Sequence, residues 1–323
     1  MKNILIIGGA GYVGTMLSDH LSNHYNITVF DLFIYGDHLN NNKIKKIKGD
    51  IRDIDLLKKV IKDFDVIIHL ACISNDPSFD LNPELGKSIN YDPFEDLVKI
   101  SKDSGVKRFI YASSSSVYGL KDYPEVNEDA SLEPLTDYSV YKAKCEEILL
   151  KYDDKNFITT IIRPATVCGF SRRQRFDLVV NILTNNAYYK NEITIFGGKQ
   201  LRPNINIKDM CNAYEVILIS PTNLVKAEIF NVGFENHSVE SLAHIVERNI
   251  KKKINIVKHI SDDQRSYHIS SNKIKHNLNF RTNYDIEDGI LDLIKAFDKN
   301  LFTDTLNNEM YFNIKRMKSI NLK

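Results

Sequence analysis

The sequence predicts an α/β fold in which a doubly wound parallel sheet carries a smaller α+β cap. Short, apolar, β-branched segments alternate with helical segments through the first half of the chain, and this rhythm breaks after Pro164. The 323 residues are 43% hydrophobic and 26% charged. Such a chain suits one large domain or two closely joined ones.

Nearly continuous apolar segments mark the strands of the first half. Strands buried on both faces of a parallel sheet have this composition. Helical segments lie between them, and the alternation indicates βαβ units. The expected strands are 3–9, 26–31, 66–71, 108–114 and 158–165, and the expected helices are 11–23, 53–62, 83–104 and 138–152.

The second half opens with the polar, arginine-rich segment "GFSRRQRFD". Two short strands are expected around the Gly-Gly turn of "EITIFGGKQLRPNINIKD", and no periodicity is clear after Leu301. The predicted domains are 1–164 and 165–323, with 206–232 as a candidate return to the first domain. The other elements expected here are helices at 177–189, 209–220, 238–250 and 285–298 and a strand at 228–233.

Composition excludes several classes of protein. The formal net charge of +1 argues against a nucleic-acid partner or a membrane-surface partner. The four cysteines form no CxxC pair, so neither a metal site nor a disulfide framework is expected. No signal peptide and no apolar segment of membrane-spanning length is present, so a cytoplasmic protein is expected.

A glycine-rich turn predicts dinucleotide binding. "GGAGYVG" supplies Gly8, Gly11 and Gly14 between a strand and a helix, and Asp31 ends the next strand. Glycines let the backbone approach a pyrophosphate at a helix N-terminus, as in Rossmann domains. Asp31 would bind the ribose hydroxyls and repel a 2′-phosphate, and "LFIYGD" after it holds no arginine or lysine. NAD is therefore favoured over NADP.

Other residues are expected to line the same cofactor site. Asp50 and Ile51 end the third strand near the expected position of adenine, although Asp50 could equally cap the helix at 53. The remaining candidates belong to the glycine turn or to the end of strand 66–71: Tyr12, Val13, Leu70 and Ala71.

"DYSVYKAKCEE" holds two tyrosine–lysine pairs at helical spacing, Tyr138 with Lys142 and Tyr141 with Lys144. Such pairs also occur on an ordinary amphipathic helix with surface charges. Together, "GGAGYVG", "GDIRD", "HLAC", "YASSSSVYG" and "YSVYK" resemble, in order and spacing, the extended short-chain dehydrogenase/reductase family in its nucleotide-sugar epimerase/dehydratase branch. The resemblance runs from residue 3 to about residue 300. It implies that Tyr138, Lys142 and Ser114 are catalytic, with Tyr138 and Lys142 also contacting NAD and the lysine and nicotinium charges lowering the tyrosine's pKa.

The resemblance also implies a nucleotide-diphosphate sugar as substrate and a homodimer formed by the helices at 83–104 and 138–152. Ser114, Thr166, Arg202 and Arg265 match substrate positions, although Thr166 stands where the family often has asparagine. Arginine suits diphosphate because its planar fork pairs with phosphate oxygens. Further candidates for the diphosphate are Arg172, Arg173 and Arg175.

The predicted function is an NAD-dependent nucleotide-sugar epimerase that oxidises C4 to a 4-keto intermediate. Ser115 and Ser116 stand where the family's 4,6-dehydratases carry an Asp-Glu pair, which argues against dehydration. A 4-dehydrogenase or a 4-keto reductase of surface-polysaccharide biosynthesis would use the same residues. A non-catalytic NAD-binding sensor or scaffold is the third reading, and the intact catalytic set argues against it.

Overall fold

The computed structural model describes residues 1–261 and 266–323, and its main feature is a seven-stranded parallel sheet. The strand order is β10-β6-β5-β4-β1-β2-β3, in which the direction of winding reverses beside β1. This confirms the predicted α/β class. The strands are β1 (Asn3–Ile7), β2 (Asn26–Asp31), β3 (Lys45–Lys48), β4 (Val66–His69), β5 (Arg108–Ala112), β6 (Ile158–Pro164) and β10 (Glu228–Val232).

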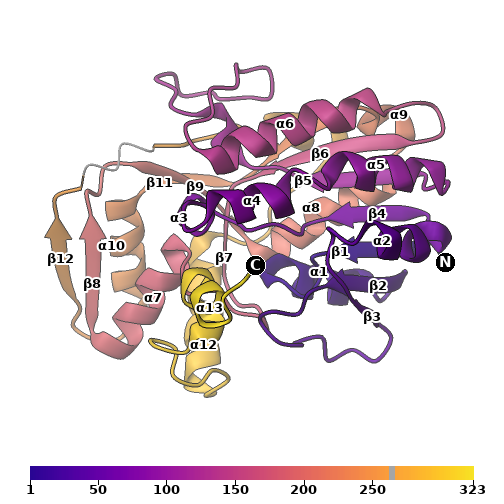
Figure 1. The fold of residues 1–323 in the computed structure, drawn as a ribbon. Coiled ribbons are helices and arrows are strands. Elements are labelled where there is room, and N and C mark those ends of the chain that lie inside the picture. The colour runs from indigo at the N-terminus through magenta and orange to yellow at the C-terminus, as the bar shows by residue number, and fades with distance from the viewer. Residues whose placement is uncertain (262–265) are drawn as a thin grey trace.

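Helices cover both faces of this sheet (Figure 1). Alternate residues of β1 enter opposite cores: Ile4 and Ile6 pack on one side, Leu5 and Ile7 on the other. The first core is covered by α1 (Tyr12–Leu21) and α8 (Ile207–Ile219). The second is covered by α2 (Ile54–Val60), α4 (Pro83–Asn90), α5 (Phe94–Asp103) and α6 (Asp137–Lys151). Short helices complete the set: α3 (Asp76–Asp80), α9 (Thr222–Val225), α11 (Asn272–Leu278) and the 3-10 turns η1 (Ile61–Asp63) and η2 (Ser115–Tyr118).

The single helix expected over 83–104 is wrong. The chain forms α4 and α5 with a break at 91–93. Pro93 lies at the N-cap of α5, and because it has no backbone N–H it could not continue the hydrogen bonding of α4. The sequence pattern alone did not separate the two amphipathic segments.

The cap contains two small sheets beside three long helices (Figure 1). The two strands expected around the Gly-Gly turn both form, but they join different sheets. β8 (Glu192–Phe196) pairs with β12 (Asn255–His259), whereas β9 (Leu201–Asn206) lies between β7 (Thr166–Cys168) and β11 (Glu235–Ser238). The helices are α7 (Val179–Lys190), α10 (Val239–Asn249) and α12 (Ile286–Asp298).

The C-terminal segment after Leu301 is ordered around aromatic contacts. Phe302 and Tyr311 pack with Phe176 and Phe297 of the cap. The 3-10 turn η3 (Glu309–Tyr311) and α13 (Asn313–Ser319) follow. In Figure 1 this yellow segment lies between the cap and the main sheet. It ends against the sheet, where Arg52 Nη2 donates to the carbonyl oxygen of Lys323 at 2.7 Å.

The four cysteines are free thiols. Among the described residues, no helix is long and apolar enough to cross a membrane. The stretch 206–232, the candidate return to the first domain, contains β10, which is an edge strand of the main sheet next to β6.

Candidate active site

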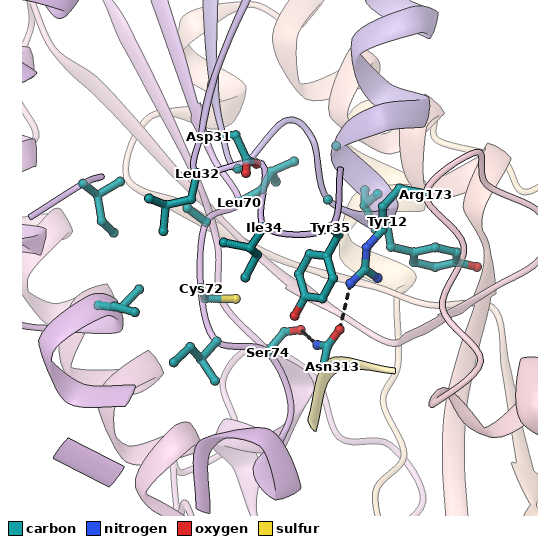
Figure 2. Close-up of a pocket in the computed structure, with 18 of the residues that line it drawn as sticks. Tyr12, Asp31, Leu32, Ile34, Tyr35, Leu70, Cys72, Ser74, Arg173 and Asn313 are labelled. Atoms are coloured by element: carbon teal, nitrogen blue, oxygen red, sulfur yellow. Dashed lines mark hydrogen bonds between the residues drawn. The ribbon is translucent and has the colours of Figure 1, made fainter. Parts of the chain in front are cut away.

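A cavity of about 220 Å³ opens at the carboxyl ends of β1, β2 and β4 (Figure 2). Ligands of doubly wound sheets bind at this edge, where the strand order reverses. Nearly all the residues predicted to contact the cofactor line this cavity: Gly8, Gly11, Tyr12, Val13, Gly14, Asp31, Asp50, Ile51, Leu70 and Ala71.

Two glycines of the turn at the floor of the cavity, Gly8 and Gly14, have no room for a side chain. Gly8 has φ +84°, and a Cβ there would lie 2.4 Å from the backbone nitrogen of Ala71. A Cβ on Gly14 would lie 2.5 Å from the carbonyl oxygen of Gly8. The N-cap of α1 is Gly11, and no side chain caps the helix there. Uncapped N–H groups beside glycines that leave the backbone accessible fit the pyrophosphate of a dinucleotide.

The carboxylate of Asp31 is held by backbone N–H groups of the turns that follow β1 and β2. Its Oδ2 accepts from the backbone nitrogen of Ala10 at 3.0 Å, and its Oδ1 accepts from that of Phe33 at 2.8 Å. Burial raises the pKa of Asp31, while these hydrogen bonds and the nearby charge of Arg173 lower it. The carboxylate thus lines the cavity in a fixed orientation, as a ribose-binding group requires.

Asp50 also lines the cavity, and its carboxylate pairs with Arg52 at 2.6 Å. The alternative that Asp50 caps the next helix is wrong, because Asp53 is the N-cap of α2 and accepts from the backbone nitrogen of Leu56. Contact with adenine stays a prediction for Asp50 and Ile51.

The two tyrosine–lysine pairs of α6 differ in their surroundings. Tyr138 is only 9% exposed and Lys142 is 3% exposed, and Lys142 Nζ donates to the carbonyl oxygen of Ala112 at 2.6 Å. Lys144 is exposed and lies 5.4 Å from the centre of the Tyr141 ring. The pair Tyr138 and Lys142 is therefore the one buried beside β5, as the family register implied.

Capping fixes the first turn of α6, which carries Tyr138. Thr136 accepts from the backbone nitrogen of Ser139, and the side chain of Ser139 accepts from that of Thr136, so the two form a capping box. Because the helix start is defined in this way, Tyr138 is held next to the loop that carries Ser114. The ring of Tyr138 lies 5.9 Å from Lys142 Nζ.

The protein raises the pKa of Tyr138 well above its usual value. Burial is the main cause, and the nearby Cys72 and Asp76 add to it. A hydrogen bond from Ser114 and the charge of Arg175 act in the opposite direction. These protein groups favour the neutral phenol, whereas the lowering that the resemblance implies comes from the nicotinium charge together with Lys142. A lower pKa needs a further positive charge near the phenol.

Of the four serines at 113–116, three are buried and only Ser114 is partly accessible. Ser113 donates to Glu146, which forms a buried ion pair with Arg163 at 2.6 Å. Ser114 Oγ lies 2.8 Å from Ser116 Oγ and stays partly accessible. Ser115 and Ser116 begin the buried turn η2. Ser114 is thus the partly accessible member of the run and hydrogen-bonds Tyr138.

Two of the predicted substrate residues, Thr166 and Arg202, lie on the cap sheet. Thr166 of β7 is opposite Asn204 of β9, two residues from Arg202. Arg202 Nη1 donates to the carbonyl oxygen of Leu201 at 2.9 Å, and its guanidinium lies 5.8 Å from the ring centre of Tyr267. Arg265 lies outside the described residues. Thr166 and Arg202 are therefore brought onto one sheet, apart from the cofactor cavity.

Several cavity residues were missed or given another role by sequence reasoning. Arg173 and Arg175, expected at the substrate diphosphate, line the cofactor cavity, and so do Asn313 and Leu322 of the C-terminal segment. Arg172 instead pairs with Asp19. The arginine-rich composition of 172–175 was a usable signal for anion binding, whereas nothing in the local sequence marks Asn313 or Leu322.

The family of the chain follows from comparison with known proteins. Residues 4–233 match the model of the NAD dependent epimerase/dehydratase family. This covers more than half of the chain, and the chain belongs to this family.

Individual relatives agree with the family but differ in activity. The chain is 28% identical to a UDP-glucose 4-epimerase of Lactobacillus helveticus, over 71% of this chain and 76% of that protein. It is 29% identical to a dTDP-D-glucose 4,6-dehydratase of Dictyostelium discoideum, over 72% of this chain and 57% of that protein.

Among solved structures, UDP-glucose 4-epimerase of Thermotoga maritima with UDP-glucose superposes with a TM-score of 0.85 at 24% identity, covering 93% of this chain and all of that one. A dTDP-glucose 4,6-dehydratase of Streptomyces venezuelae with NAD bound gives 0.83 at 21% identity, covering 92% of this chain and 97% of that one. These similarities support the fold alone.

Proposed function

We propose that this protein is an NAD-dependent nucleotide-sugar epimerase that acts through a 4-keto intermediate. The observation that carries the proposal is the placement of Tyr138. Its phenol hydrogen-bonds Ser114. Cys72 and Arg175, whose charges shift the pKa of this phenol, both line the cavity that contains the glycine turn. A substrate hydroxyl at Tyr138 would thus lie beside the cofactor site.

Each residue of this group has a defined task. As a phenolate, with its pKa lowered by the positive charges of Lys142 and of bound NAD, Tyr138 would accept the proton of the sugar hydroxyl, and Ser114 would donate a hydrogen bond to the same oxygen. Lys142 is anchored by the carbonyl oxygen of Ala112 and would supply a fixed positive charge to the nicotinamide ribose of bound NAD. Bound NAD would accept the hydride from C4 and return it. Return to the opposite face of the 4-keto sugar completes an epimerisation with no net oxidation.

Ser115 and Ser116 favour this reaction over 4,6-dehydration. Both are 7% exposed and stand where an acid–base pair would be needed to eliminate water across C5 and C6. A serine hydroxyl cannot serve as that acid or base near neutral pH. The 4,6-dehydratases among the relatives therefore share the fold and family, and the proposal does not extend their activity to this chain.

Substitution of Tyr138 tests the proposal. Tyr138→Phe should lower turnover of UDP-, dTDP- or GDP-linked hexoses by about a hundredfold or more, the scale of a lost acid–base group. Tyr141→Phe is the matched control, because Tyr141 lies on the same helix and packs on Tyr91. Equal turnover in wild type and Tyr138→Phe would contradict the catalytic role of Tyr138. Net release of a 4-keto sugar with NADH would instead identify a 4-dehydrogenase.

A further inference from the structure

Two buried arginines of the cap segment 170–177 enter the wall of the cofactor cavity. Arg173 is 2% exposed and Arg175 is 7% exposed, and both line the cavity with Gly8, Gly11 and Asp31. Figure 2 shows the guanidinium of Arg173 beside the ring of Tyr35. The cap therefore brings two positive charges to the dinucleotide site of the main sheet.

Part of the hydrogen-bonding capacity of these arginines is unused within the described protein. Nε and Nη1 of Arg173 and Nη2 of Arg175 are buried and have no hydrogen-bond partner there. Buried polar groups in proteins are almost always paired, and a buried charged donor without an acceptor is costly. Donors of this kind that line a cavity indicate an anionic ligand.

Contacts hold both guanidinium groups in place. Arg173 lies 3.6 Å from the ring centre of Tyr35 and donates through Nη2 to Asn313 Oδ1 at 2.8 Å. Arg175 donates through Nε to Asp177 at 2.8 Å and through Nη1 to Ser74 Oγ at 2.8 Å. Since the side chains are already ordered, little conformational entropy is lost when they bind a ligand.

Asn313 of the C-terminal segment connects these contacts. Its Nδ2 donates to Ser74 Oγ at 3.2 Å, and its backbone nitrogen donates to Asp177 Oδ2 at 2.8 Å. Figure 2 shows the path from Arg173 through Asn313 to Ser74. One residue of the tail thus orients both arginines.

We propose that Arg173 and Arg175 bind the pyrophosphate of the cofactor from the cap side, with Asn313 as their positioning residue. The arginine fork matches phosphate oxygens, and the uncapped α1 turn supplies donors to the same group. The substrate diphosphate is a poorer assignment, because Arg202 lies on the cap sheet outside this cavity. This inference rests on the NAD site of the proposed function and adds that cap and tail help retain NAD between half-reactions.

Nucleotide binding tests the proposal independently of turnover. We would measure the affinities of adenosine and ADP-ribose for the nucleotide-free protein by calorimetry. Arg173→Gln should weaken ADP-ribose binding by about 10- to 100-fold, the effect of losing charged hydrogen bonds, and leave adenosine binding unchanged. Arg172→Gln is the matched control, because the neighbouring Arg172 pairs with Asp19 outside the cavity, and it should change neither affinity.

Two outcomes would overturn the proposal: an unchanged affinity for ADP-ribose, or an equal loss for adenosine and ADP-ribose, which would indicate a merely structural role. If Arg173→Gln does not fold, as judged by circular dichroism, Arg173→Lys replaces it. The lysine keeps the charge but lacks the planar fork, so ADP-ribose binding should weaken while adenosine binding stays unchanged. Failure of the proposed function would look different: the wild-type protein would bind ADP-ribose, and Arg173→Gln would weaken that binding, but no nucleotide sugar would be turned over.

Discussion

The glycine turn offers a controlled test of the cofactor site, because the chain contains a matched pair of glycines. Gly8 and Gly105 have nearly the same backbone angle, φ +84° and +83°. A Cβ at Gly105 would meet nothing within 4 Å, whereas one at Gly8 would lie 2.4 Å from the nitrogen of Ala71. Substitution by alanine therefore adds the same backbone strain at both positions and a steric clash only at Gly8.

The expected magnitudes follow from these two terms. The left-handed backbone costs an alanine roughly 1–2 kcal/mol at either position. The clash at Gly8 is with backbone atoms of the β4 end, so it requires shifts that cost about 1–3 kcal/mol more. Gly8→Ala should therefore lower the free energy of unfolding by about 1–3 kcal/mol more than Gly105→Ala does.

The assay combines urea unfolding, followed by circular dichroism, with calorimetric NAD binding. Because the clash moves the turn against which a pyrophosphate would lie, Gly8→Ala should weaken NAD binding by about tenfold or more, and Gly105→Ala should leave it unchanged. Equal destabilisation and equal NAD affinity in the two variants would refute the view that the close approach of Gly8 to Ala71 shapes the cofactor site.

Two further predictions concern stability and assembly. Burial lowers the pKa of His69 to about 3 from an ordinary 6.5. Between these two pKa values the unfolded chain binds a proton that the folded protein does not. The free energy of unfolding should therefore fall by about 2 kcal/mol from pH 8 to pH 5. His69→Leu should remove this dependence and His244→Gln, at an exposed position, should keep it; identical urea-unfolding profiles for wild type and His69→Leu would contradict this. Light scattering at micromolar concentration should give twice the chain mass of 37.2 kDa, through α4, α5 and α6, and a monomer would rule out the predicted homodimer.

Local sequence patterns predicted the fold class and the cofactor turn well. Buried parallel strands, the glycine turn and Asp31 each lie within a short βαβ unit, so their spacing in the sequence determines their spacing in space. The family register selected Tyr138 and Lys142 within one helix, and the structure buries this pair, while its catalytic role stays a prediction. The same local reasoning failed at 83–104, where a proline separates two helices of similar amphipathic pattern.

Long-range contacts could not be predicted in this way. Asn313 reaches Arg173 and Ser74 only because the tail packs its aromatic residues on the cap and then crosses to the main sheet. Arg173 and Arg175 were recognised as anion-binding candidates, yet which phosphate they face depends on how the cap is placed. The pKa of Tyr138 likewise depends on burial and on Cys72, Asp76 and Arg175, which are distant in sequence.

The most direct test of the central claim follows the hydrogen at C4. Nucleotide hexoses linked to UDP, dTDP and GDP, deuterated at C4, would be incubated with the purified protein and NAD and followed by NMR and by absorbance of NADH. If the protein is a C4 epimerase, one of them should become its C4 epimer with deuterium kept at C4 and no net NADH, and Tyr138→Phe should abolish the conversion. Loss of C4 deuterium to solvent, or conversion that proceeds unchanged in Tyr138→Phe, would contradict it.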